Sequence, residues 1–405
     1  MTSKTRPRLY VSGPDEVKSE KSTDIYFLRA REILEKTQSD QKTAVAEAHT
    51  YGLPGTYQWA VAAGIEEVAW LLEGLPVDVY AVEEGTIFRE LSPILAVEGP
   101  YSRYGIYESS LLGILRHASS ITTKAARIKL RAGGKPVIFF GVRCVHPAIS
   151  PMVDRAAYLG GCDAVSGVMG AEMIGVKPTG TMPHALILVV GDPSQAWKAF
   201  DSVMPADVPR IALCDTFSDE RLESLTAANT LKERLYGVRL DTPSSRRGNI
   251  KRIVEEVRWS LDLNGFKDVK IFVSGGIDEE EILELRDFVD GFGVGTSIAF
   301  PPSVDIALDI VEVDGRPLSK RGKLPGRKQV YRCPNFHEYL TPFKKTLEKC
   351  PRCGKRTKPL LTKLISNGEI VRPLPTSKTI RDYVLDQLAK LSEITDFQKE
   401  PTLLH

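Results

Sequence analysis

The feature that most constrains the fold of this chain is a series of short apolar runs between about residues 137 and 295. Nearly every run ends in a charged, hydroxyl-bearing or glycine residue, such as Arg143, Asp215 or Ser274. Continuous apolar runs of this length are typical of buried parallel strands, and in α/β barrels the chemistry lies where those strands end. The pattern therefore predicts an α/β barrel with several polar groups around one opening.

Segments with helical periodicity fill the intervals between the runs, so strand and helix alternate as they do in βα barrels. We count seven candidate strands when residues 185–190 are included, and His184 directly precedes that strand. Because eight strands close such a barrel, we expect an irregular or incomplete α/β barrel.

The sequence outside the runs predicts an N-terminal α/β domain of sandwich-like type, a basic segment with a small zinc-knuckle-like extension, and a C-terminal helix. A length of 405 residues is consistent with two or three domains. The expected parts are residues 1–115, with a loose leader over 1–20, then the barrel over 116–300, the basic segment and zinc-knuckle-like module over 301–370, and the helix over 371–405.

The composition is that of an ordinary globular protein, with 42% hydrophobic and 26% charged residues. The formal net charge of +2 argues against a bulk field for nucleic acid or an anionic membrane. No apolar run approaches the roughly 20 residues that span a bilayer, and the first residues lack the apolar core of a signal peptide. We therefore expect a cytoplasmic protein.

Two kinds of strand end could bind phosphate. In RLDTPSS, Arg239 and Asp241 could hold a polyphosphate with Mg²⁺, and Asp215 at the previous strand end could supply a second oxygen ligand. The alternative is a capped helix start with an ordinary surface aspartate. Glycine-rich turns at residues 274–276 and 293–296 offer backbone N–H groups for a phosphate, although tight turns need glycine anyway.

Other polar residues allow a functional and a structural interpretation. His184 is either a catalytic residue or a buried, hydrogen-bonded one. Phe140 and Arg143 share a strand end and suit a flat anionic ring, or they are a core phenylalanine and a surface arginine. Near the N-terminus, Ser22 or Thr23 is expected to cap a helix, and Asp24 and Tyr26 could themselves be a helix cap and a core residue.

A resemblance to a known family rests on an ordered set of segments rather than on any single motif. The set resembles the nicotinate phosphoribosyltransferase family over about residues 20–332, and most of all its shorter archaeal-type members with a zinc-knuckle-like extension. The segments are STDIYF, ESSLLGILRHASSITTKAARI, FFGVRC, YLGGCDAVSG, GTMPHALI, ALCDTF, GVRLDTPSS, FVSGGIDEEEI, GFGVGTS and PGRKQVYR.

The resemblance implies a base-binding region. Tyr26 resembles the aromatic residue that stacks on nicotinate from the partner subunit of a homodimer, and Phe140 resembles the opposing ring. Arg143 resembles the cation beside the base, and Asp163 and Ser166 resemble residues that line the pocket.

The resemblance also implies how the other substrates are held. His184 resembles the histidine that ATP phosphorylates in many members. Asp215, Arg239 and Asp241 resemble the group that binds Mg²⁺ and the pyrophosphate of phosphoribosyl pyrophosphate. The cradle for its 5′-phosphate is implied at Ser274, Gly275, Gly276, Gly293, Gly295 and Thr296.

The implied reaction converts nicotinate and phosphoribosyl pyrophosphate to nicotinate mononucleotide and pyrophosphate in NAD biosynthesis, with ATP hydrolysis coupled to it. A homodimer with shared active sites, or a higher oligomer, is implied as well. Quinolinate or nicotinamide is the alternative base. Quinolinate has two carboxylates and calls for a denser basic pocket, whereas neutral nicotinamide needs Arg143 less.

A cysteine cluster lies near the C-terminal end. Cys350 and Cys353 form a C-x-x-C turn of the kind that binds tetrahedral zinc, and Cys333 with His337 would complete a structural Cys₃His site. The alternatives are reduced cysteines without a metal, or a nucleic-acid-binding knuckle supported by the neighbouring basic residues.

Overall fold

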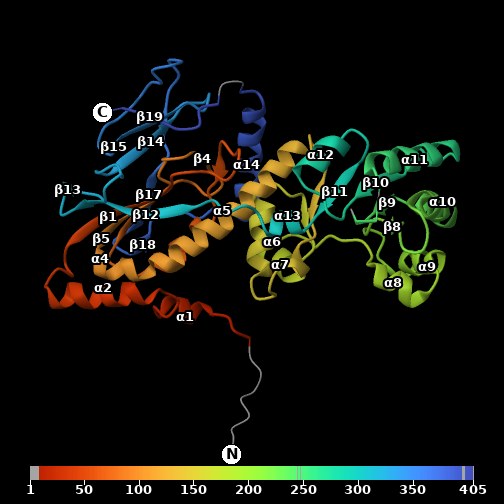
Figure 1. Ribbon diagram of the computed structural model, residues 1–405, viewed down its shortest axis with the longest axis horizontal. Coiled ribbons are helices and arrows are strands. Elements are labelled where there is room, and N and C mark those ends of the chain that lie inside the picture. Colours follow the sequence, from red (N-terminus) through yellow and green to blue (C-terminus); the bar gives the residue numbers. More distant parts are fainter. Residues whose placement is uncertain (1–8, 244, 247, 395–396, 405) are drawn as a thin grey trace, which may run out of the picture. The chain divides into compact units, whose positions relative to one another are not determined.

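The computed structural model describes residues 9–243, 245–246, 248–394 and 397–404, and its chain forms two compact units. Residues 1–8 of the expected leader and Ser244 of the RLDTPSS segment lie outside the described residues. The antiparallel unit comprises residues 1–120, 302–376 and 393–405, and the parallel-sheet unit comprises 121–301 and 377–392. Figure 1 labels their elements.

The parallel-sheet unit is built on a six-stranded parallel sheet, which confirms an incomplete barrel. The order is β7-β6-β11-β10-β9-β8, so β7 and β8 are the edges of a half-barrel. The strands are β6 (Val137–Phe139), β7 (Ala164–Val165), β8 (Ile211–Leu213), β9 (Gly237–Leu240), β10 (Lys270–Val273) and β11 (Gly291–Val294). Their apolar side chains are buried, as continuous apolar runs require.

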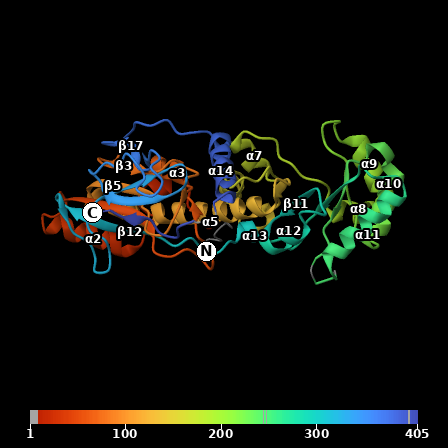
Figure 2. The same cartoon turned by 90° about the horizontal axis from the view of Figure 1, so that it is seen from above.

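Helices connect these strands. In Figures 1 and 2, α9, α10 and α11 lie together at one end of this unit. The helices are α6 (Ser150–Leu159), α7 (Val168–Ile174), α8 (His184–Val190), α9 (Pro193–Val203), α10 (Glu220–Leu231), α11 (Ile250–Leu263), α12 (Glu279–Leu285), α13 (Thr296–Ala299) and α14 (Ser377–Ser392), with short 3₁₀ turns at Val142–Cys144 and Lys232–Arg234. No described helix combines the length and the apolar character that a membrane span requires.

The predicted strand over residues 185–190 is wrong, because this run forms α8. Pro183 precedes the helix in an extended conformation, and Gly191 ends it with a left-handed φ of 85°. A short apolar run fits a strand or a helix equally well by composition. His184 is therefore the first residue of a helix and does not precede a strand.

The antiparallel unit is built on a seven-stranded antiparallel sheet of order β13-β12-β1-β5-β3-β17-β18. Its strands are β1 (Thr43–Thr50), β3 (Asp78–Ala81), β5 (Leu95–Pro100), β12 (Ile306–Val313), β13 (Arg316–Pro317), β17 (Thr362–Ser366) and β18 (Glu369–Ile370). A two-stranded sheet pairs β2 (Ala60–Val61) with β4 (Ile87–Phe88), and a four-stranded sheet contains β16 (Lys358–Pro359), β14 (Lys328–Arg332), β15 (Glu338–Pro342) and β19 (Thr402–Leu403).

The helices of this unit include one over residues 14–18, so the leader that was expected to be loose over 1–20 is helical there. They are α1 (Pro14–Lys18), α2 (Ile25–Lys36), α3 (Ile65–Leu72), α4 (Tyr101–Tyr104) with a 3₁₀ turn at Gly105–Tyr107, and the first half of α5 (Glu108–Arg131). Of the cap candidates, Asp24 occupies the N-cap position of α2, and Ser22 and Thr23 precede it. The Thr23 hydroxyl donates instead to the Ile106 carbonyl at 2.6 Å.

The two units group the chain differently from the expected parts. Residues 302–376 group with the N-terminal segment because β12, β13, β17 and β18 join the sheet of β1, β3 and β5. The C-terminal helix α14 groups with the parallel-sheet unit, where it packs against α6. Pairing between strands far apart in sequence thus links segments that the chain order separates.

Candidate active site

A cavity of about 500 Å³ lies at the carboxyl ends of strands in the parallel-sheet unit. Parallel strands direct their carboxyl ends to one edge, so the residues that follow them meet there. The Phe140 N–H donates to the Val294 carbonyl at 2.8 Å, which joins two of these strand ends. The predicted residues that line the cavity are Phe140, Arg143, Ser166, His184, Arg239, Asp241, Ser274, Gly275, Gly276, Gly293, Gly295 and Thr296.

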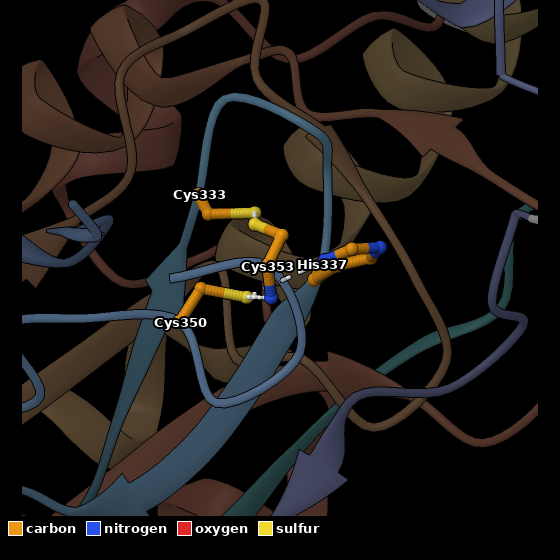
Figure 3. Close-up of side chains that lie close together, drawn as sticks. All are labelled: Cys333, His337, Cys350 and Cys353. Atoms are coloured by element: carbon orange, nitrogen blue, oxygen red, sulfur yellow. Dashed lines mark hydrogen bonds between the residues drawn. The ribbon is translucent and has the colours of Figure 1, made fainter. Parts of the chain in front are cut away.

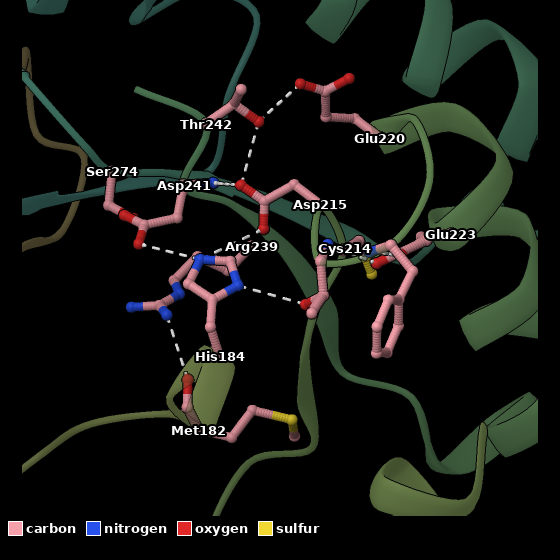
Figure 4. Close-up of polar contacts among 12 residues, drawn as sticks. Met182, His184, Cys214, Asp215, Glu220, Glu223, Arg239, Asp241, Thr242 and Ser274 are labelled. Atoms are coloured by element: carbon pink, nitrogen blue, oxygen red, sulfur yellow. Dashed lines mark hydrogen bonds and ion pairs between the residues drawn. The ribbon is translucent and has the colours of Figure 1, made fainter. Parts of the chain in front are cut away.

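His184 lies between the ends of β8 and β9 (Figure 4). Its Nδ1 is 3.1 Å from the Thr216 Oγ1. Its Nε2 is 3.6 Å from Asp215 Oδ1 and 3.5 Å from Asp241 Oδ2. Both ring nitrogens therefore face polar groups, and His184 is a member of a polar cluster rather than an isolated core histidine.

Asp215 lies behind the residues that line the cavity, with a side chain that is only 4% exposed. Its Oδ2 accepts hydrogen bonds from the Asp241 N–H at 2.8 Å and from the Thr242 hydroxyl at 2.9 Å. Its Oδ1 is buried without a hydrogen-bond partner in the described part of the chain. Burial raises the pKa of Asp215, against the opposing influence of His184 and Thr242.

Asp241 and Arg239 project from the end of β9. The Ser274 hydroxyl donates to Asp241 Oδ1 at 2.5 Å, which leaves Oδ2 directed towards His184. The Arg239 Nη2 donates to the Met182 carbonyl at 3.1 Å, and its guanidinium lies 5.7 Å from the Phe140 ring centroid. Burial lowers the pKa of Arg239, and the nearby aspartates oppose that shift.

The two glycine turns have conformations that side chains would obstruct. Gly275 and Gly276 have φ angles of 81° and 70°, in the left-handed region that favours glycine. A Cβ at Gly275 would lie 2.7 Å from the Asp241 carbonyl oxygen, and one at Gly293 would lie 2.4 Å from the Phe140 ring. The absence of side chains here allows the Asp241 backbone to approach Gly275 and lets Phe140 lie against β11.

Asp163 is not in the cavity, contrary to the expectation that it lines the pocket. It precedes β7, at the opposite end of that strand from Ser166. Its Oδ2 accepts from Lys129 Nζ at 2.7 Å and from the Val137 N–H at 2.8 Å, and its Oδ1 accepts from Arg381 at 2.8 Å. These contacts make Asp163 an anchor for α5, β6 and α14.

Tyr26 lies on α2 of the antiparallel unit and is 57% exposed. Its proposed stacking on a base in a partner subunit remains a prediction.

Two cavity-related residues were missed by the sequence interpretation. Cys144 lines the cavity, with its Sγ 3.4 Å from the Thr296 Oγ1. Thr216 directly follows Asp215 and contacts His184. The sequence could have indicated both residues, because each follows an apolar run within a few positions, as the predicted site residues do.

The second candidate site is the cysteine cluster of the antiparallel unit (Figure 3). The ligand atoms of Cys333, His337, Cys350 and Cys353 all lie within 4.8 Å of one another. The Cys333 and Cys353 sulfurs are 3.7 Å apart, and His337 Nδ1 is 3.4 Å from the Cys350 sulfur. Tetrahedral zinc with bonds of about 2.3 Å to sulfur separates its ligands by about 3.8 Å, so the donor set fits this metal.

Comparison with known proteins identifies the family to which most of the chain, residues 24–119 and 121–309, is similar. The family model for the N-terminal domain of quinolinate phosphoribosyl transferase matches residues 24–119, and the model for its C-terminal domain matches residues 121–309. These ranges include the predicted base, phosphate and magnesium residues but not the cysteine cluster.

Individual relatives agree with this match. A nicotinate phosphoribosyltransferase of Mycobacterium tuberculosis is 31% identical over 337 residues, which cover 78% of this chain and 69% of the relative. One from Bacillus subtilis is 27% identical over 361 residues, covering 77% and 73%.

Solved structures show the same fold. The crystal structure of a nicotinate-nucleotide pyrophosphorylase from Pyrococcus furiosus has a TM-score of 0.94 and 56% identity, and the match covers 96% of this chain and 99% of that one. Human nicotinic acid phosphoribosyltransferase has a TM-score of 0.75 at 20% identity, with coverage of 95% and 97%. The chain is a phosphoribosyltransferase and belongs to the nicotinate phosphoribosyltransferase family.

Proposed function

We propose that this enzyme transfers the phosphoribosyl group of phosphoribosyl pyrophosphate to nicotinate and so makes nicotinate mononucleotide for NAD biosynthesis. The pyridine nitrogen attacks the anomeric carbon, the bond from that carbon to the pyrophosphate oxygen breaks, and pyrophosphate leaves. The observation that carries the proposal is one cavity lined by an aromatic ring, two arginines, an aspartate, a histidine and two glycine turns.

The base subsite is proposed at Phe140 and Arg143. A flat ring can stack on Phe140 while its carboxylate pairs with a guanidinium. Among the described residues that line the cavity, the lysine and arginine side chains are those of Arg143 and Arg239. With Arg239 assigned to pyrophosphate, one cation remains for the base, which favours a single carboxylate and hence nicotinate over quinolinate.

The sugar phosphates are proposed to bind along the ends of β9, β10 and β11. Arg239 can form charge-assisted hydrogen bonds with the pyrophosphate and stabilise the charge that develops as it departs. Gly275, Gly276 and Gly295 line the cavity without side chains that would block the approach of the 5′-phosphate, and Thr296 adds a hydroxyl. The Ser274 hydroxyl donates to Asp241, so its proposed role is to orient that carboxylate.

We infer that Mg²⁺ accompanies phosphoribosyl pyrophosphate. The oxygens available for it are Asp241 Oδ2, directed towards His184, and the buried Asp215 Oδ1 that lacks a partner among the described residues. Carboxylate oxygens are the donors that Mg²⁺ prefers, usually together with phosphates and water. When bound, Mg²⁺ would neutralise charge on the departing pyrophosphate.

We infer that ATP is a co-substrate that phosphorylates His184. A ring nitrogen of His184 attacks the γ-phosphorus, the bond from that phosphorus to the ADP oxygen breaks, and ADP leaves. Water later cleaves the phosphorus–nitrogen bond and releases phosphate. The position of His184 in the cavity wall, next to Asp215 and Asp241, supports this role.

The cysteine cluster is proposed to hold a structural zinc ion. All six cysteines of the chain are free thiols, so Cys333, Cys350 and Cys353 are available as thiolate ligands together with His337. Four protein ligands leave no open position, which is typical of a structural rather than a catalytic site. Free thiols also support the inference of a cytoplasmic location.

We infer a homodimer, or a higher oligomer, in which Tyr26 of the partner subunit covers the base. The support is the exposed apolar face of α2, where Ile25 and Tyr26 are each 57% exposed beside Ile33 at 60%. Exposed apolar side chains gathered on one helix face are typical of interaction surfaces.

The names of the relatives support nicotinate as the base. The Mycobacterium tuberculosis and Bacillus subtilis relatives are named nicotinate phosphoribosyltransferase. The Pyrococcus furiosus structure is named for nicotinate nucleotide and pyrophosphate, which would be products with either nicotinate or quinolinate as the base, so its name supports the phosphoribosyl transfer and not the choice of base.

A substrate panel tests the proposal. Purified enzyme with Mg²⁺ and phosphoribosyl pyrophosphate should release pyrophosphate with nicotinate, and much less with nicotinamide or quinolinate, in the presence and absence of ATP. ATP should stimulate the nicotinate reaction, and His184→Ala should reduce that stimulation more than basal turnover. Turnover of quinolinate with release of carbon dioxide would contradict the assigned base.

A further inference from the structure

The carboxylate of Glu223 binds the backbone of the loop that follows β8, at residues 216–218. Glu223 of α10 accepts the Thr216 N–H on Oε2 at 3.0 Å, and it accepts the Phe217 and Ser218 N–H groups on Oε1 at 2.6 and 2.9 Å. Three successive N–H groups that converge in this way form an anion-binding concavity. Here the anion is a side chain of the protein itself, Glu223, which is labelled in Figure 4. Glu223 is 4% exposed.

Capping of α10 does not account for this arrangement. Asp219 is the N-cap residue, and its Oδ1 accepts the Leu222 N–H at 2.8 Å. The three N–H groups bound by Glu223 lie upstream of that cap. A buried carboxylate at position 223 therefore serves the loop over residues 216–218 rather than the start of the helix.

The same loop supplies groups to both nitrogens of His184. Thr216 Oγ1 lies 3.1 Å from Nδ1, and Asp215 Oδ1 lies 3.6 Å from Nε2. A change in the backbone at residues 215–216 would therefore displace the groups that face both ring nitrogens.

Polar groups face both nitrogens of the ring. Nε2 faces carboxylate oxygens of Asp215 and Asp241. Nδ1 lies within hydrogen-bond distance of the Thr216 hydroxyl. Because these groups contact the ring from two sides, the positions of Asp215 and Thr216 determine how the imidazole is oriented.

We propose that Glu223 is a positioning residue for His184. By fixing the loop, it places the Thr216 hydroxyl at Nδ1 and the Asp215 carboxylate at Nε2, and so fixes the orientation of the imidazole. The link to ATP rests on the proposed function, whereas the effect on the imidazole rests on the loop geometry alone.

The imidazole effect is tested by ¹⁵N NMR of the ring nitrogens in the full-length protein, with the His184 signals identified by their loss in His184→Gln. Glu223→Gln keeps the size of the side chain but turns an NH₂ group towards N–H donors. Thr216→Val keeps the backbone and removes the hydroxyl. Both variants should shift the His184 ring signals from their wild-type positions, because the hydroxyl that faces Nδ1 is displaced in the first and removed in the second.

Asp219→Asn is the matched control, because it changes an acid at the N-terminus of α10 but retains an oxygen that can cap the helix. It should leave the His184 signals unchanged. The proposal is overturned if folded Glu223→Gln has the His184 signals of the wild type, or if Asp219→Asn alters them as much.

A kinetic measurement separates this role from general loss of structure. In Glu223→Gln and Thr216→Val, stimulation of turnover by ATP should fall about 10-fold or more, because small displacements of reacting groups are costly. Turnover without ATP should fall much less. Equal loss of both rates in Glu223→Gln would overturn the positioning role. If the wild type shows no ATP stimulation, the ATP step fails as a proposal, and the NMR comparison still decides the role of Glu223.

Discussion

The cavity and the cysteine cluster are assembled from the sequence in opposite ways. The cavity draws residues from Phe140 to Thr296, because a parallel sheet brings distant strand ends to one edge. The cluster draws its four ligands from Cys333 to Cys353, a short segment with little core of its own. Substitutions in the first region should therefore change the reaction, and substitutions in the second should change stability.

The largest effect is expected from removing a ligand of the cluster. Cys350→Ser should abolish stoichiometric zinc binding and lower the free energy of unfolding by about 5 kcal/mol or more, because binding free energy at a structural zinc site acts as folding free energy. Elemental analysis and thermal unfolding would measure both.

The matched control for that variant is Cys162→Ala, which alters a buried cysteine of the parallel-sheet unit outside the cluster. It should retain about one zinc ion per chain, at a cost typical of a small core substitution. Wild-type protein without metal, or Cys350→Ser with full zinc content, would contradict the structural-zinc proposal.

The next effect concerns the cavity. Asp241→Asn should reduce the Mg²⁺-dependent rate by about 10² to 10³-fold, as expected when one group that stabilises developing charge is removed. The thermal midpoint should change little, because asparagine can still accept the hydrogen bond from Ser274. Steady-state kinetics over a range of Mg²⁺ concentrations would measure the loss, and a rate within about twofold of the wild type would remove Asp241 from the site.

The features that the sequence could predict are those that follow from local pattern. Apolar runs ending in polar residues located the parallel strands, and the positions after them located Phe140, Arg239 and Asp241 in one cavity. Ligand spacing located the cysteine cluster in the same way. In each case the chemistry lies at a fixed offset from a recognisable element.

The features that could not be predicted depend on contacts across the fold. The run after His184 is apolar enough for a strand, and only its flanking Pro183 and Gly191 indicate a helix. Asp163 also precedes an apolar run, but on the side away from the cavity, where Lys129 and Arg381 bind it. Spacing gives the position of a residue along a strand, whereas partners from other elements decide what its side chain does.

A smaller effect is expected from Asp154, which tests how the interior of the parallel-sheet unit tolerates a buried carboxyl group. Asp154 of α6 is fully buried, and burial raises its pKa to about 6. A Cβ at Gly167 would lie 1.9 Å from its Oδ2, so the carboxyl group packs tightly against the backbone next to Ser166.

The sign of the pH dependence follows from that raised pKa. The protonated form is favoured in the folded state, so its contribution to stability is complete below about pH 4 and is lost as the pH rises through 6. Asp154→Asn should remove this dependence and gain up to about 3 kcal/mol relative to the wild type between pH 4 and 7. Denaturant unfolding at a series of pH values would measure it, and parallel curves for the two proteins would contradict it.

The smallest effect distinguishes the two interpretations of Asp163. If Asp163 is an anchor for Lys129 and Arg381, Asp163→Asn should lower the free energy of unfolding by only about 1 kcal/mol. The effect is small because the carboxylate is partly exposed and solvent screens its ion pairs. Nicotinate turnover should stay within about twofold of the wild type, since the side chain does not line the cavity. Asp382→Asn, which breaks the exposed pair with Lys378 on α14, should cost still less. A large rise in the KM for nicotinate in Asp163→Asn alone would return Asp163 to the pocket, and with it the role that the family resemblance implied.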